Sequence, residues 1–367
     1  MKAGKTRSNK FIVPILLTLT ICAGAVSRQK NAAVIYTEAF ADMREFPSDG
    51  FAKEADSYIA EKRNEWRKDL YEFLDSSRYT LESITAAQTA EYCDFNDGVT
   101  DRSVLTTKPL PYEKVVNLAR LILLEARKQE RFGSLSKVSK LCRGALKLSY
   151  DVLSERSRAA MMLGLKVKIM AHRPVSDYLS NTHVKSAEKE EFREFFEKEE
   201  SEKVTLLDSI DGEEERSINL LRQIVLNRDL IKLNVRERSS LDRALEFGRA
   251  VSSDAEKLIS HYYEKIREAA ENRSAESIAA VNRDIAMLAR KAGNVKKSYV
   301  AARELFFESV ELSKEKDPAP FVDRAAALFV VIGVPDFQQT IDDYYRAEDL
   351  YGDLLASKAN GRSDEGR

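Results

Sequence analysis

The chain has 367 residues, of which 43% are hydrophobic and 32% are charged. This composition provides a sizeable core and a soluble surface, and it excludes a disordered chain and a multi-span membrane protein. Gly (14) and Pro (8) are scarce, which favours long helices over a loop-rich sandwich. Basic residues (59) nearly balance acidic ones (60), so no overall basic field indicates nucleic acid as a partner.

Residues 1–27 have the composition of an export signal. Four basic residues precede an apolar run of 16 residues, from 11 to 26, and no acidic residue occurs before Glu38. The small residues at 23–25 suit a cleavage site. Two alternatives stay open: an uncleaved anchor at 11–26, because sixteen helical residues span about 24 Å, and a lipid-modified Cys22. In each case we expect an extracytoplasmic protein, either periplasmic or anchored and facing the periplasm.

Without residues 1–27 the chain keeps 55 basic against 60 acidic residues, a net charge of −5. A mildly acidic body disfavours nucleic acid or anionic lipid as the main partner, so we expect membrane contact only through residues 11–26, and only if they are not cleaved. Cys93 and Cys142 remain. They could form one disulfide in an oxidising compartment, or Cys142 could be a small apolar residue of a helix core.

Helical periodicity dominates the rest of the chain. Asn31 is a candidate cap for a first helix, and a turn at 47–50 ends it. One amphipathic helix then places Ile59, Trp66, Leu70, Phe73 and Leu74 on one face. Residues 93–111 form a long loop. Its Asn-Asp-Gly sequence at 96–98 does not fit a calcium loop, because Cys93 and Phe95 occupy the positions of two oxygen ligands.

The segment from Tyr112 to Arg173 predicts a helical hairpin that turns at Gly133. The spacing of Ala126, Gly133, Val138 and Ala145 resembles that of a tetratricopeptide (TPR) repeat. Similar spacing recurs from Ala286 through Gly293 and, more loosely, from Ala326 through Gly333. The aromatic positions of the repeat are missing, and the two clear matches begin 160 residues apart. The expected fold class is therefore all-α, with TPR-like or solenoid hairpins, although any antiparallel helix pair favours small residues at such positions.

Residues 183–204 predict a charged bridging helix with Phe192, Phe195 and Phe196 on one face. Asp211–Gly212 is predicted to break the chain after it. His172, next to Arg173–Pro174, is typical of a helix end. Five segments are expected: an export signal at 1–27, an N-terminal helical domain at 28–182, the bridging helix at 183–204, a C-terminal helical domain at 205–358, and a frayed tail at 359–367.

No phosphate-binding glycine loop, HExxH, CxxC or GxSxG motif occurs. The three His residues stand far apart, and carboxylates are too numerous for any pair to be singled out. We therefore predict no catalytic, cofactor-binding or metal-binding residue.

Three local patterns lie at 31–40, 92–95 and 118–121. Together they resemble a group of uncharacterised exported bacterial proteins with TPR-like helical hairpins, over residues 28–170. The resemblance implies export and an all-helical fold, and it implies no activity.

We expect a non-enzymatic scaffold or protein-interaction protein of the cell envelope, because stacked hairpins present concave surfaces to a protein or peptide. The alternatives are an enzyme that uses carboxylates in a helical cleft, and a purely structural envelope component. Buried, mutually close carboxylates in a deep pocket would favour the enzyme, whereas a groove lined by Tyr and Arg would favour binding.

Overall fold

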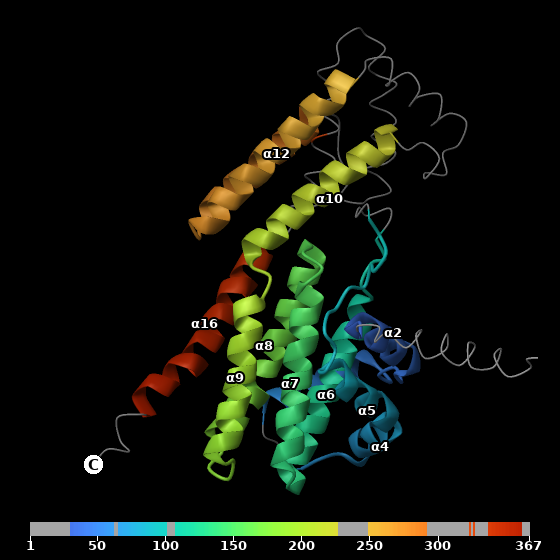
Figure 1. Ribbon diagram of the computed structural model, residues 1–367, viewed down its shortest axis with the longest axis vertical. Helices are drawn as coiled ribbons and strands as arrows, with labels where there is room; N and C mark the ends of the chain where they lie inside the picture. Colours follow the sequence, from blue (N-terminus) through green and yellow to red (C-terminus); the bar gives the residue numbers. More distant parts are fainter. Residues whose placement is uncertain are drawn as a thin grey trace, which may run out of the picture.

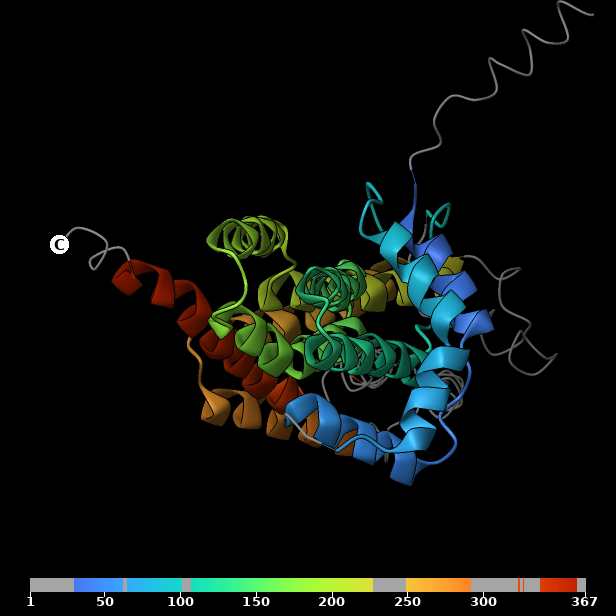
Figure 2. The same ribbon diagram turned by 90° about the horizontal axis from the view of Figure 1, so that it is seen from below.

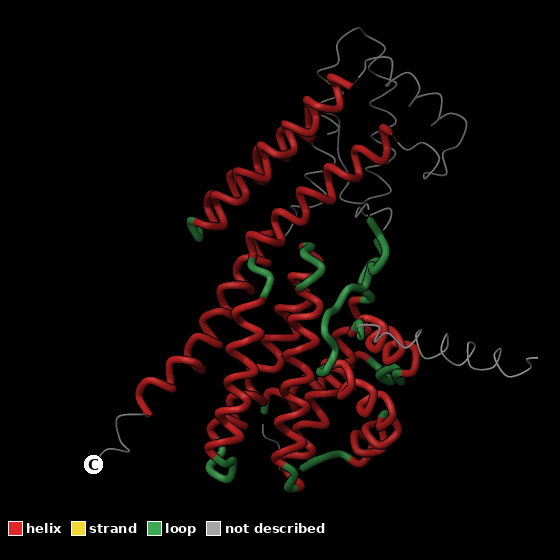
Figure 3. Tube along the Cα trace, in the orientation of Figure 1, coloured by secondary structure: helices red, strands yellow, loops and turns green. Residues whose placement is uncertain are grey.

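The computed structural model describes residues 30–61, 65–100, 107–226, 249–291, 323, 326 and 337–361. Within these ranges the chain consists of helices and loops without a strand (Figure 3), apart from one isolated bridge between Asn31 and Tyr92. The prediction of an all-α fold is confirmed. The helices are α2 (Ala32–Asp42), α3 (Asp49–Ala60), α4 (Lys68–Ser76), α5 (Arg78–Ala87), α6 (Tyr112–Phe132), α7 (Leu135–Leu153), α8 (Arg158–Ser180), α9 (Ser186–Glu202), α10 (Leu206–Leu226), α12 (Arg249–Glu271), α13 (Ala275–Lys291) and α16 (Phe337–Gly361).

The helix predicted across Ile59–Leu74 is wrong, because α3 and α4 are separate helices at this point. Two contacts draw together the chain on either side of the break. The Tyr58 hydroxyl donates to the Glu65 carbonyl oxygen at 3.1 Å, and Arg67 pairs with Glu54 of α3 at 2.6 Å. The predicted apolar residues are still buried or half-buried, but two helices share them.

The predicted hairpin turn at Gly133 is confirmed between α6 and α7. Gly133 has φ +99°, the left-handed conformation that favours glycine, and its N–H donates to the Gln129 carbonyl at 3.1 Å. The next pair, α7 and α8, packs closely at Gly164. A Cβ at that position would lie 2.6 Å from Leu153 Cγ and 2.9 Å from the Ser149 carbonyl oxygen, so only glycine allows this approach.

Two predicted helix ends are wrong. The helix does not end near His172, because α8 continues through Pro174 to its last residue, Ser180. The chain also does not break at Asp211–Gly212, which lies inside α10. A Cβ on Gly212 would lie 1.8 Å from the Arg156 carbonyl oxygen. Glycine is therefore present to allow close packing of α10 against the turn before α8.

The charged segment at 183–204 contains α9, on which Phe192 and Phe196 are buried as the pattern predicted. Beyond it, α10 and α12 run side by side and project from one end of the bundle (Figure 1). Viewed from below, α2–α5 lie along one side of the α6–α8 bundle and α16 lies on the other (Figure 2). Ala347 and Tyr351 of α16 belong to the same apolar core as α2–α9.

The division into domains at 28–182 and 205–358 stays a prediction, although α16 packs on α8 across that division. Several predicted features lie outside the described residues: the export signal at 1–27 and the hairpin turns at Gly293 and Gly333. Of the tail predicted at 359–367, residues 359–361 belong to α16 and are helical, and the rest lies outside the described residues.

Candidate functional site

The first candidate site is an open cleft of about 390 Å³ where α16 meets the turn between α12 and α13. We call it the α16 cleft. It is lined by Arg273, Ala275, Gln338, Ile341, Asp342, Tyr345, Arg346, Asp349 and Leu350.

One wall of the α16 cleft is the tight turn after α12. Arg273 has φ +53°, and Ser274 caps α13 by accepting from the Ser277 N–H at 3.1 Å. The Arg273 guanidinium lies 4.5 Å from the centroid of the Tyr345 ring, and the Tyr345 hydroxyl donates to the Ala270 carbonyl at 2.9 Å. The arginine and the tyrosine are therefore held together at the cleft by the helix end and by α16.

The remaining lining combines both signs of charge with apolar surface. Arg346 is exposed, Asp342 and Asp349 reach solvent, Ile341 is buried and Leu350 is half-buried. A desolvated acid–base pair would need buried carboxylates with raised pKa values, and neither carboxylate here is buried. Mixed charge beside Tyr and Arg suits a polypeptide segment, since these residues are enriched where proteins bind each other.

A second cleft, of about 310 Å³, lies between the α2–α3 connection, the start of α6, and α8. Its cationic side chains are engaged with neighbouring helices. Lys166 donates to the Tyr112 hydroxyl at 3.0 Å, Lys114 donates to a backbone carbonyl of α2 at 2.9 Å, and Arg120 makes two hydrogen bonds to Asp56 at 2.7 and 2.9 Å. This cleft is chiefly a place where helices are joined.

Against α16 lies a half-buried ionic cluster, the α16 network, formed by Tyr150, Lys168, Glu200, Lys203 and Glu348. Lys168, only 1% exposed, lies 2.5 Å from Glu200 and 3.7 Å from Glu348. Lys203 joins the same two carboxylates at 2.7 and 2.6 Å. The Tyr150 hydroxyl donates to Glu200. The network therefore joins α7, α8 and α9 to α16.

Burial and pairing act in opposite directions on the pKa values of this network. Burial lowers the pKa of Lys168, despite the attraction of Glu200. Burial alone would raise the pKa of Glu200, but Lys168 and hydrogen bonds from Lys168, Lys203 and Tyr150 lower it by more. The pairing keeps Glu200 charged, so the network serves to hold helices together.

Two carboxylates with raised pKa values, Asp151 and Glu199, share Lys147 at 2.8 and 3.4 Å. Burial is the main cause of both increases, and Lys147 offsets it in part. Asp151 also accepts from the Tyr36 hydroxyl at 2.8 Å. Neither carboxylate lines the two clefts. Asp151 and Glu199 therefore take part in the packing of α2, α7 and α9.

Cys93 and Cys142 are both free thiols, so the disulfide left open by the sequence is not formed. Burial raises the pKa of the Cys142 thiol to about 12 and also raises that of Cys93. Both therefore stay protonated at neutral pH and are poor nucleophiles.

In the described part of the chain no three His, Cys, Asp or Glu residues are grouped as a metal site would need. The expectation that catalytic, cofactor and metal residues are absent stays a prediction.

Comparison with known proteins finds no matching protein-family model, no matching curated protein and no matching solved structure. Among the described helices, none combines the length and the apolar character needed to cross a bilayer.

Proposed function

We propose that this chain is a non-enzymatic helical interaction protein, and that a segment of a partner protein binds in the α16 cleft. The observation that supports the proposal most directly is the stacking of the Arg273 guanidinium on Tyr345, 4.5 Å from the ring centroid, at the edge of an open cleft. Arg and Tyr are two of the three residue types that most often dominate the energetics of protein interfaces. Arg346 and Asp342 add charges of both signs for orienting a peptide.

We further propose that the protein acts outside the cytoplasm and that its α6–α7 hairpin is TPR-like. The basic and apolar segments of residues 1–27 support export. Ala126 and Ala145, both at most 1% exposed on either side of the Gly133 turn, support the resemblance to the repeat. The mass of the N-terminus in protein isolated from its native cell distinguishes a cleaved signal from an anchor that is retained at residues 11–26.

The binding proposal is tested by placing a photo-crosslinking side chain at Gln338, which lines the α16 cleft. We expect one polypeptide partner to be captured reproducibly in the native envelope. Arg273→Ala and Tyr345→Ala should each reduce the yield about tenfold, the usual loss at a residue that dominates an interface.

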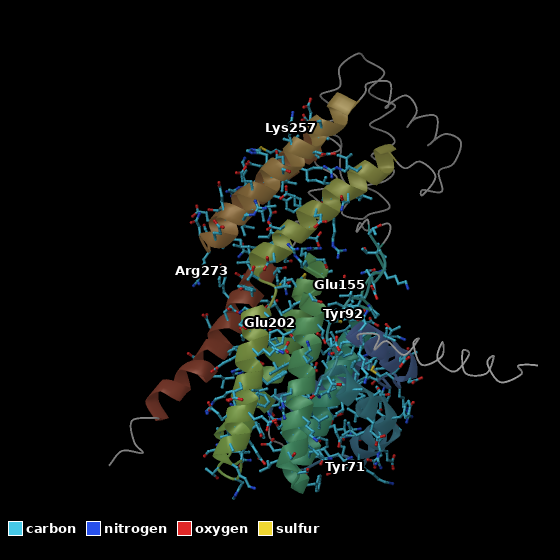
Figure 4. The ribbon with its side chains drawn as sticks, in the orientation of Figure 1. Tyr71, Tyr92, Glu155, Glu202, Lys257 and Arg273 are labelled. Carbon is cyan, nitrogen blue, oxygen red and sulfur yellow. The ribbon has the colours of Figure 1, made fainter. Side chains whose placement is uncertain are left out.

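The matched control is the same crosslinker at Lys257, which is exposed on α12 (Figure 4) and lies outside the lining of the cleft. Capture of the same partner with equal yield at Lys257, or undiminished capture in the Arg273→Ala variant, would contradict the proposal.

A further inference from the structure

Three aromatic side chains form a continuous row where the start of α4 meets the end of α6. Trp66 precedes α4, Tyr71 lies in α4, and Phe132 is the last residue of α6. We call Trp66, Tyr71 and Phe132 the aromatic strip. The ring centroids of Trp66 and Tyr71 are 5.6 Å apart with a tilt of 42°, and those of Tyr71 and Phe132 are 5.8 Å apart with a tilt of 57°. Successive rings are tilted rather than parallel, so the surface of the row is uneven instead of flat.

The strip is anchored at one end and exposed at the other. Tyr58, which is 4% exposed, holds Trp66 at a centroid distance of 5.1 Å. Trp66 and Tyr71 are half-buried, whereas Phe132 is 59% exposed. The left-handed Gly133 ends α6 directly after Phe132, which fixes the position of its backbone. An anchored row of rings loses little side-chain entropy when a partner binds.

Two cations lie beside the strip. Lys128 stands 5.9 Å from the Tyr71 centroid, but it is already paired with Asp75 at 2.8 Å. Arg131 is exposed and lies 5.7 Å from the Phe132 centroid. No carboxylate in the described part of the chain lies within ion-pair distance of Arg131. Arg131 therefore carries a positive charge that a ligand can complement next to the exposed end of the strip.

We propose that the aromatic strip binds a proline-rich segment of a protein in the polyproline II conformation, with an acidic residue of that segment at Arg131. A polyproline II helix rises about 3.1 Å per residue with three residues per turn, so the residues on one of its faces recur about every 9 Å. Three rings spaced 5.6 and 5.8 Å apart form a row long enough to contact one such repeat. Rows of aromatic rings are the surface that recognises such segments, because the ligand is already extended and loses little entropy. The guanidinium of Arg131 sets the direction in which the segment lies.

This surface is separate from the α16 cleft. Tyr71 lies at the lower end of the helical bundle, whereas Arg273 lies at the lower end of α12 on the other side of the molecule (Figure 4). The inference therefore does not depend on the proposed function, and the two can fail independently.

Trp66 is the single tryptophan of the chain, so its fluorescence reports on the strip directly. The full chain is titrated to about 1 mM, the weak end of specific binding, with a ten-residue oligoproline peptide that carries two aspartates at one end. We expect a saturable change in Trp66 emission. Phe132→Ala should weaken binding about tenfold, and Arg131→Glu should weaken it about fivefold while creating a preference for the same peptide with lysines instead of aspartates.

Tyr79→Ala and Arg273→Ala are the matched controls. Tyr79 is a 73% exposed tyrosine outside the strip, and Arg273 belongs to the α16 cleft, so both variants should bind the peptide as the unchanged chain does. Thermal melting confirms that Phe132→Ala is folded. Three results would overturn the inference: no saturable signal with either peptide, equal affinity in Phe132→Ala, or an emission change produced instead by self-association or by vesicles of anionic lipid.

Discussion

At the scale of single residues, Gly212 decides how closely α10 approaches the turn before α8. Because a Cβ there would lie 1.8 Å from the Arg156 carbonyl oxygen, Gly212→Ala must push two backbones apart. We expect it to cost about 2–3 kcal/mol and to lower the melting temperature followed by circular dichroism.

Gly352 provides the matched control for this substitution. It lies inside α16, and a Cβ added there would meet no neighbouring heavy atom within 4 Å, so alanine gains helix propensity without a clash. Gly352→Ala should stabilise the chain by about 0.5–1 kcal/mol. If Gly212→Ala melts at or above the temperature of the unchanged chain, close packing is not the reason for this glycine.

At the scale of helices, the α16 network should respond unequally to loss of its two central partners. Glu200→Gln removes the main partner of the Lys168 ammonium, which is 1% exposed, and leaves Glu348 at 3.7 Å as its remaining carboxylate in the described part of the chain. Breaking a buried ion pair by removing one partner costs about 3–5 kcal/mol. Lys168→Met leaves Glu200 with Lys203 at 2.7 Å and the Tyr150 hydroxyl, so we expect a loss below about 1 kcal/mol. Chemical denaturation at pH 7 measures both.

The pH dependence of Glu200→Gln gives a second measurement of the same network. The pKa of Glu200 is lowered in the folded protein, so its contribution to stability is present above its unfolded pKa, about 4.3. That contribution is lost as pH falls through the lowered folded pKa. The stabilities of Glu200→Gln and of the unchanged chain should therefore converge below about pH 4. A larger loss in Lys168→Met than in Glu200→Gln at pH 7 would contradict this account.

The sequence predicts that the chain is helical, but it does not predict every helix end or which helices meet. Gly133 and the Phe192–Phe196 stripe could be interpreted correctly because their causes lie within one or two turns of helix. Gly212 was misinterpreted because a chain break and a close approach both favour glycine, and the deciding atom belongs to Arg156. In the α16 cleft, Arg273 of the turn after α12 contacts Tyr345 of α16, and no local sequence pattern contains that contact. Lys168, between apolar Val167 and Ile169, is a local signal of a buried charge.

At the scale of the whole molecule, α16 ties the end of the chain to the core of its first half. Tyr351, 1% exposed, stacks on Phe196 with ring centroids 5.1 Å apart, and its hydroxyl donates to the Lys168 carbonyl at 2.8 Å. A single core built from residues far apart in the sequence, such as Ala32 and Tyr351, tends to unfold cooperatively. Trp66 fluorescence and far-ultraviolet circular dichroism should therefore give the same unfolding midpoint, even though Trp66 lies within 28–182 and Tyr351 lies within 205–358.

Tyr351→Ala tests this coupling directly. Loss of a buried aromatic ring costs about 3–5 kcal/mol, and because α16 packs on α8, the loss should lower the midpoint reported by Trp66 as well as that reported by circular dichroism. Tyr79→Ala, at a tyrosine that is 73% exposed, should change the stability reported by either probe by less than about 0.5 kcal/mol. If Tyr351→Ala leaves the Trp66 transition unchanged while the dichroism transition moves, the segments 28–182 and 205–358 fold independently and α16 is only loosely attached.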